Sequence, residues 1–410
     1  MSDRPIVMVT HEILDGWATM PDGPVALRLK QKLLPVEESG IVFPPTYADI
    51  GYNIDTLSDG TRVVTIDSVG SQANRLEPVF KSDSKNPEDW LVPQIEIVLR
   101  KEDCGDCEAC KKNAAAGEGG KGNKEACTQP REVTRSLLDL AHRAADAVVQ
   151  SSPSLLRLVG PAFKALQRGD AAPLCALAPT SLLFGVWDSR GETGEKRPRL
   201  VRSIIRGWDV EPLHAAAQFN SVWKLLNEEQ QEELEKEAKA RKTKLSEKGL
   251  ADAPATFRKT EAPQYRDGLP NPEARVLGGV LVKGRIEREV TVNLVALRGL
   301  RGANDGETAA IRRYLLGLSL VAATVDIELF LREGCLLRYA ENSNQWFQVP
   351  RRDEPTLVAL SAKTAEEYAK RAAEHFRLKW PTSLTHEFNL AEAKKLLAKK
   401  TAEKEPGQAG

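Results

Sequence analysis

Alternation of apolar and polar side chains predicts several strands along the chain. Between residues 24 and 36, Leu27 and Leu29 fall on one side, whereas Arg28, Lys30 and Lys32 fall on the other. This is the pattern of a half-exposed strand, and its exposed face is basic. Similar patterns predict strands at residues 62–67, 93–100, 181–187, 278–283, 289–296, 327–331 and 336–339.

Apolar residues at helical spacing predict helices at residues 71–80, 134–150, 154–168, 307–325, 364–376 and 390–400, the last two as surface helices. The first of these follows a small-residue turn, and we expect Gly70 and Ser71 to open it. Residues 228–248 are almost purely Glu, Lys, Gln and Ala, which predicts a solvent-exposed helix followed by a linker. Strands and helices alternate, so the chain is expected to have a mixed α and β fold.

The overall charge balance says nothing about a polyanionic ligand, because 58 Lys and Arg residues offset 58 Asp and Glu residues. A polyanionic ligand could therefore be indicated only by local clusters of charged residues. Residues 190–206 contain two acids, Glu192 and Glu195, and six cations: Arg190, Lys196, Arg197, Arg199, Arg202 and Arg206. Such a run suits contact with RNA phosphates whatever the base sequence, although a solvated loop has the same composition.

A second candidate RNA contact is the predicted helix start after Gly70. Backbone N–H groups at a helix start attract phosphate, and Ser71, Gln72, Asn74 and Arg75 lie in that first turn. An ordinary capped helix would explain the same residues. The basic strand face at Arg28, Lys30 and Lys32 is the third candidate RNA contact. We predict core packing for Trp187 and Trp208 in preference to base stacking.

Four of the six cysteines are clustered, at Cys104, Cys107, Cys110 and Cys127. Four thiols suit tetrahedral zinc, and an iron–sulfur cluster or uncoordinated thiols are the alternatives. No apolar run approaches the roughly 20 residues that cross a bilayer, and no signal-peptide core is apparent. We therefore expect a soluble, cytoplasmic protein in which a metal clips a loop together without an open coordination position.

The sequence offers little for catalysis. The five histidines are far apart, and no phosphate-binding loop, dinucleotide fingerprint or nucleophile elbow is present. Asp67 and Asp188 are the acids that a metal-dependent ribonuclease would use. A zinc-stabilised protein-interaction module is a further alternative, in which the arginines meet an acidic protein.

Four stretches in the same order resemble the type I-G (formerly I-U) CRISPR-associated RAMP protein family, whose members form the backbone of the Cascade effector. Residues 67–77 read DSVGSQANRLE, residues 135–143 read RSLLDLAHR, residues 179–191 read PTSLLFGVWDSRG, and residues 199–203 read RLVRS. The resemblance extends from about residue 24 to about residue 339. It is weakest across the cysteine segment and residues 228–272.

The resemblance implies an α+β fold, with a ferredoxin-like or RRM-like palm carrying large helical and loop insertions as finger and thumb. It implies a non-catalytic subunit that binds CRISPR RNA, lines up with copies of itself and other Cascade subunits, and supports pairing of the guide with target DNA. The strand–helix pattern of residues 62–80 and the strand–helix–strand pattern of residues 289–339 would then supply the two halves of the palm.

The expected organisation places the first half of the palm at residues 1–100 and the second at 276–345. Between them lie the cysteine insertion at 101–130, a helical insertion and basic hairpin at 131–226, and a charged helix and linker at 227–275. Residues 346–410 form C-terminal helices.

Overall fold

The central feature of the structure is a large, mainly antiparallel sheet. The computed structural model describes residues 6–47, 50–104, 106–115, 127–128, 131–189, 191–215, 222–243, 245–248, 250, 265–266, 269–270 and 276–402. The sheet has ten strands. Its main path runs β1 (Val7–Met8), β21 (Thr356–Ala359), β20 (Gln345–Val349), β2 (Ala26–Pro35), β17 (Ile286–Asn293), β12 (Val201–Trp208), β7 (Arg62–Asp67) and β6 (Ile54–Thr56). β19 (Cys335–Tyr339) also pairs with β2, and β18 (Phe330–Arg332) pairs with β19.

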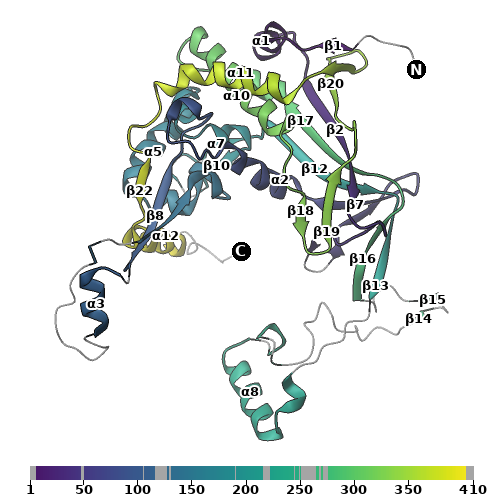
Figure 1. The fold of residues 1–410 in the computed structure, drawn as a ribbon, viewed down its shortest axis with the longest axis vertical. Coiled ribbons are helices and arrows are strands. Elements are labelled where there is room, and N and C mark those ends of the chain that lie inside the picture. Colours follow the sequence, from purple (N-terminus) through teal and green to yellow (C-terminus); the bar gives the residue numbers. More distant parts are fainter. Residues whose placement is uncertain are drawn as a thin grey trace, which may run out of the picture.

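Helices cover one face of this sheet. Figure 1 shows α2 (Val69–Leu76) and α10 (Asp305–Thr324) on the same side of it, with α11 (Ala362–Arg377) beside α10. Leu27 and Leu29 of β2 and Val290 and Val292 of β17 are buried beneath these helices. The intervening side chains of both strands are only partly buried or exposed, so the opposite face is open. α1 (His11–Thr19) and α9 (Leu294–Arg298) pack at one end of α10.

A second, mainly helical part lies beside the sheet (Figure 1). It contains α4 (Ala147–Gln150), α5 (Pro153–Gln167), α6 (Ala172–Leu177), α7 (Pro179–Leu183) and α12 (Leu390–Ala402). These helices share it with a three-stranded sheet in which β8 (Glu96–Glu102) lies between β9 (Arg131–Ser136) and β22 (Thr385–Glu387), and with the hairpin of β10 (Val186–Trp187) and β11 (Lys196–Arg197). Its apolar residues continue the core under α10.

Smaller elements complete the described chain. β13 (Val210–Ala215), β16 (Val276–Val282) and β3 (Ile41–Val42) form a sheet beyond the end of β12. The short pairs are β4 (Thr46–Tyr47) with β5 (Gly51–Tyr52), and β14 (Tyr265–Arg266) with β15 (Leu269–Pro270). α3 (Glu108–Ala115) carries one of the clustered cysteines, and α8 (Glu228–Ala240) is largely exposed. Within the described residues, none of the helices combines the length and apolar character needed to span a bilayer.

Most of the predicted elements are confirmed, and two are wrong. Residues 134–150, predicted as one helix, begin in strand β9 and become helical only in two 3-10 turns and α4. Residues 181–187, predicted as a strand, continue helix α7 before β10 begins. α2 starts at Val69 and its N-cap is Ser68, whose hydroxyl accepts from the Ser71 N–H, so Gly70 and Ser71 do not open it.

The expected division of the palm also differs from the structure. Strand β12, placed by the sequence in a basic hairpin insertion, lies inside the central sheet between β17 and β7. β7, expected as a palm strand, lies on the outer side of β12, while β2 pairs with β17 at the centre. α11 is a surface helix, as predicted: one face is exposed, and the other packs on α10 through buried residues such as Tyr368 and Phe376.

A buried arginine occupies the centre of the covered face. Arg288 of β17 is fully buried, and its Nη1 donates to Gln31 Oε1 at 2.6 Å. Its Nε lies 3.2 Å from Ser203 Oγ and 3.3 Å from Gln72 Oε1. Burial lowers the pKa of Arg288, but a guanidinium stays protonated in proteins, so the core holds a charge that depends on these acceptors.

The same network continues to a buried carboxylate. Asp67 at the end of β7 is fully buried, and its Oδ2 accepts from Gln72 Nε2 at 2.6 Å and Arg75 Nε at 3.1 Å. Arg332 Nη2 lies 3.4 Å from the other oxygen, Oδ1. Gln72 therefore bridges a buried cation and a buried anion, and connects α2 to β7, β12 and β17.

We expect Arg288→Ala to lower the free energy of unfolding by about 3 kcal/mol, because the change leaves a cavity and several buried acceptors without a donor. Urea unfolding measures this difference. The control is Arg338→Ala, which removes an exposed arginine from β19 and should change the free energy by less than about 0.5 kcal/mol. Equal effects of the two substitutions would contradict the assigned role of Arg288.

Candidate metal centre and nucleic-acid interface

A β-hairpin brings the four clustered cysteines together. β8 and β9 are paired up to Glu102 and Arg131, which lie opposite each other at the hairpin's outer end. Cys104, Cys107 and Cys110 follow β8, the last of them within α3, and Cys127 precedes β9. Figure 1 shows α3 at the far end of this hairpin. The pairing of β8 with β9 therefore brings Cys127 close to the three cysteines that follow β8.

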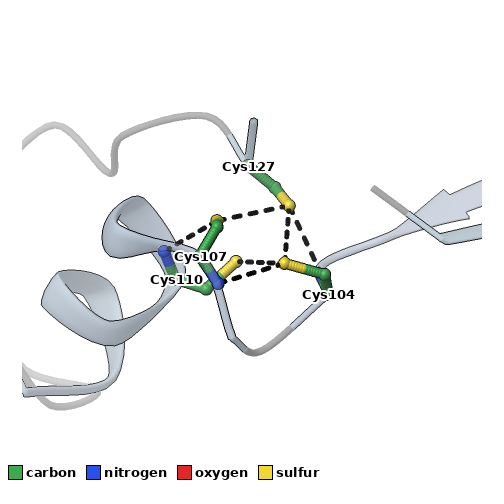
Figure 2. Close-up of side chains that lie close together, drawn as sticks. All are labelled: Cys104, Cys107, Cys110 and Cys127. Atoms are coloured by element: carbon green, nitrogen blue, oxygen red, sulfur yellow. Dashed lines mark hydrogen bonds between the residues drawn. The ribbon is translucent and has the colours of Figure 1, made fainter. Parts of the chain in front are cut away.

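The four sulfur atoms converge on one point (Figure 2), and all lie within 4.8 Å of one another. The separations are 3.9 Å between Cys104 and Cys110, 3.7 Å between Cys107 and Cys127, and 3.5 Å between Cys127 and Cys104. Four thiolates at about 2.3 Å from a tetrahedral zinc ion are about 3.8 Å apart. The arrangement therefore fits a tetrathiolate metal site.

Backbone N–H groups donate hydrogen bonds to two of the cysteine sulfur atoms. The Cys107 N–H donates to Cys104 Sγ at 3.3 Å, and the Cys110 N–H donates to Cys107 Sγ at 3.5 Å. Hydrogen bonds from the backbone of Cys110 and of Thr128 lower the pKa of the Cys107 thiol to about 5. All six cysteines are described, and none of them forms a disulfide. The cluster could thus hold a metal such as zinc, and four protein ligands would leave no open position for catalysis.

The open face of the central sheet gathers basic residues from two distant segments. Arg28, Lys30 and Lys32 of β2 alternate with buried residues and point to this face. Through β17, Arg28 and Arg202 of β12 share the row of Thr291, and Lys32 and Arg206 share the row of Glu287. We call these five side chains the basic face.

Neighbouring residues on the open face modify its chemistry. The Arg28 guanidinium lies 5.1 Å from the centre of the Phe347 ring on β20, a cation–π contact. Lys30 lies 3.7 Å from Glu287, an ion pair that leaves part of both side chains exposed. Arg338 of β19 is exposed and its register with Leu34 puts it on the same face. Sequence reasoning missed Arg338 and Phe347, although alternation in the two strands that carry them could have indicated both.

The predicted helix-start contacts lie on the other side of the sheet. Gln72 is fully buried and bonds to Ser203, so the prediction that its side chain contacts RNA is wrong. The Arg75 side chain is 28% exposed, and its guanidinium contacts Asp67 and the carbonyl of Leu331 at 2.7 Å. Ser71 is half-buried and Asn74 is exposed on α2. One groove along the sheet therefore cannot include both α2 and the basic face.

Of the remaining predicted cations, Lys196 and Arg197 form strand β11 of the β10–β11 hairpin. Arg197 pairs with Glu195 at 2.9 Å and donates to the carbonyl of Leu166 at 3.0 Å, which fastens the hairpin to α5. Arg199 is exposed, and Arg190 lies outside the described residues.

One of the two tryptophans of this region, Trp187, differs from its predicted role in the core. Trp187 on β10 is 60% exposed, with the Lys196 ammonium 5.5 Å from its ring. Trp208 is half-buried, and the Arg285 guanidinium lies 4.6 Å from its ring. The prediction that Trp187 packs in the core is wrong, because its short strand lies at the edge of the hairpin.

We expect the purified chain to contain about one tetrathiolate-bound metal ion, with zinc as the metal that elemental analysis finds. Cys107→Ser should abolish stoichiometric metal binding and loosen the segment around residues 101–131, because this segment has little core of its own. Cys175→Ser, which removes a buried thiol far from the cluster, is the matched control and should leave the metal content unchanged. A wild-type chain without bound zinc or iron would contradict this prediction.

Comparison with known families finds similarity to a CRISPR-associated family. Residues 27–212 match the family model described as CRISPR-associated protein GSU0053, and no curated protein matches the chain. The matched segment begins in β2, includes the cysteine cluster and contains the whole of β12. It therefore includes all five residues of the basic face. The match supports a CRISPR-associated protein family for this chain.

Proposed function

We propose that the chain is a non-catalytic backbone subunit of a type I-G Cascade effector, in which several copies bind one CRISPR RNA and support its pairing with target DNA. The observation that carries this proposal is the basic face, because it assembles five cations from β2 and β12 within the segment that matches the CRISPR-associated family. Other Cascade subunits would then be the protein partners of the chain.

Electrostatics favour RNA as the ligand of this face. The whole chain has zero net charge, yet β2 and β12 place five cations on a surface where β17 contributes only Glu287 and Glu289 as acids. Adjacent strands are about 4.8 Å apart, so β2 and β12 can contact phosphates on either side of β17. Because every nucleotide has a phosphate, such a surface can bind a guide of any sequence. Phe347 adds a ring on which a base could stack.

The order of the central strands supports the expected ferredoxin-like palm. In the row β20, β2, β17 and β12, helix α2 lies between β2 and β12 in sequence, and α10 lies between β17 and β20. A ferredoxin-like unit has this order of strands, with two helices on one face. β7 and β6 then extend the unit beyond β12, and the β8–β9 hairpin and the β13–β16 sheet are additions to it.

The ribonuclease alternative has little support from Asp67. Both of its oxygens contact protein donors, and the side chain is inaccessible to solvent. A catalytic metal requires ligand carboxylate oxygens that reach the ion at a site open to the substrate. We therefore assign Asp67 to the stability of the fold, and the cysteine cluster to a structural metal clip.

We expect the double substitution Lys32→Ala and Arg202→Ala to weaken binding of single-stranded RNAs of unrelated sequence by similar factors. Log affinity falls as log salt concentration rises, and each lost phosphate contact should make this negative slope shallower by about 0.7 to 1. Fluorescence anisotropy over a range of salt concentrations measures both effects.

The matched control for this experiment is Lys363→Ala with Lys370→Ala, which removes two lysines from α11 on the other side of the sheet. The control should leave the salt slope unchanged. Equal losses in both double variants would show that overall charge, and not the basic face, determines binding. Loss confined to one RNA sequence would indicate recognition of bases instead.

A further inference from the structure

Four arginines outside the basic face lie at one end of the central sheet. They are Arg298 at the end of α9, Arg301 in the connection to α10, Arg312 in α10, and Arg351 after β20. β2 begins at this end, because Ala26 pairs with Asn293 at the end of β17 and with Val349 at the end of β20. Arg28 of the basic face is two residues further along β2. We call the four side chains the rim arginines.

Backbone carbonyl groups orient two of the rim arginines toward the same loop. Arg298 Nη1 donates to the carbonyl of Trp17, near the end of α1, at 3.2 Å, and its Nη2 donates to the carbonyl of Pro24 at 2.7 Å. Arg351 Nη2 donates to the carbonyl of Pro21 at 2.8 Å. The loop between α1 and β2 therefore holds two guanidinium groups from distant parts of the chain. Its carbonyl groups are neutral, so both positive charges remain.

The other two rim arginines continue this group. Arg312 Nε donates to the carbonyl of Leu300 at 3.0 Å, just beyond α9. Burial, followed by the charges of Arg351 and Arg312, lowers the pKa of Arg298. Burial and the charge of Arg301 lower the pKa of Arg312 in the same way. Each charge of the group thus acts on its neighbour, and all four form one positive region.

The rim arginines form no ion pair with any acid that the structure describes. The acids of the same loops, Asp22, Asp353 and Glu354, are exposed and form no ion pair within the described residues either. By contrast, Arg313, the next residue of α10, lies 3.0 Å from Asp15. Because guanidinium groups stay protonated, the rim arginines repel one another until an anion binds.

Phosphate is the anion that this position favours. A planar guanidinium can donate two parallel hydrogen bonds to a phosphate or to a carboxylate, so the group itself fits either. The rim begins where the sheet row of Arg28 ends, however. A nucleic-acid strand that lies on the basic face and passes the start of β2 would bring further phosphates to the rim, whereas carboxylates would require a separate protein partner.

We infer that the rim arginines bind phosphate groups of a nucleic-acid strand whose neighbouring nucleotides lie on the basic face. The exposed side chains of Arg301 and Arg351 contact the phosphates, and the half-buried Arg298 and Arg312 add positive potential beside them. This inference rests on the proposed function, because it extends the RNA surface past the end of the sheet.

Fluorescence anisotropy of the full chain with an oligouridine of about 12 nucleotides tests the inference. Arg301→Gln with Arg351→Gln should weaken binding at least about fivefold at about 0.1 M salt and make the salt slope shallower by about 1.4, since each phosphate contact of a single strand contributes about 0.7. Combining this pair with Lys32→Ala and Arg202→Ala should add the two slope changes. The wild-type chain should bind one strand, because one strand contacts both surfaces.

The matched control is Arg168→Gln with Lys394→Gln. It removes two exposed cations of the helical part that also have no ion pair within the described residues, and should leave affinity within about twofold. Arg301→Gln alone removes a side chain without a hydrogen bond in the described chain. It should give about half of the slope change, and it replaces the double variant if that variant fails to fold.

The outcomes separate this inference from the proposed function. If the Lys32 and Arg202 pair weakens binding and the Arg301 and Arg351 pair behaves like the control, the inference is wrong and the proposed function stands. If only the Arg301 and Arg351 pair weakens binding, the basic face is wrong, and so is the shared path of the strand. Two strands per chain, or no RNA binding by the wild type, would also overturn the inference. Unchanged RNA affinity with reduced self-association in sedimentation experiments would assign the rim to an acidic surface of a second copy.

Discussion

The buried guanidinium of Arg288 constrains the rest of the structure. A charge in the core must be surrounded by acceptors, and these come from β2, β12 and α2 through Gln31, Ser203 and Gln72. The carbonyl of Ala323, near the end of α10, lies 3.4 Å from the same side chain. The acceptors of this one side chain therefore include groups from both helices, α2 and α10, on the face of the sheet that these helices cover.

The open face follows from this arrangement. Successive side chains of a strand point to opposite faces, so placing Arg288 and Gln31 under the helices puts Glu287, Lys30 and Lys32 on the other side. A register shift of one residue would bury these charges, which makes the pairing strongly specified. The core network and the proposed RNA surface are thus two results of one strand register.

The helical part is attached to the sheet by another buried ion pair. Arg143 Nε lies 2.7 Å from Glu77 Oε2, and both residues are buried. Burial raises the pKa of Glu77 to about 7 although the Arg143 charge opposes this shift. The positive φ of 54° at Arg143 shows that the turn is held in a conformation unusual for a residue with a side chain. Arg143 thus contacts both Glu77, at the C-terminal end of α2, and the carbonyl of Gly185, which follows α7.

The sequence by itself determined the elements whose patterns are local. Alternation indicated β2, the sequence pattern at residues 62–67 indicated β7, helical spacing indicated α5 and α10, and thiol spacing indicated a cluster of four cysteines that could hold a metal. Arg288 alternates with the apolar positions of β17, but the strand predicted at residues 289–296 begins after it. Local patterns failed at β9, because its register with β8 outweighs the helical spacing of its apolar residues.

Only the tertiary structure decided which of these residues act together. Gln72 and Arg202 both looked like RNA contacts, but the sheet lies between their side chains, and the helix-covered side engages Gln72 and Arg75 in protein contacts. Conversely, Arg28 and Arg202 are far apart in sequence, and β17 brings them into one row. Contacts between distant segments set these relationships, and a pattern read along one strand or helix carries no information about them.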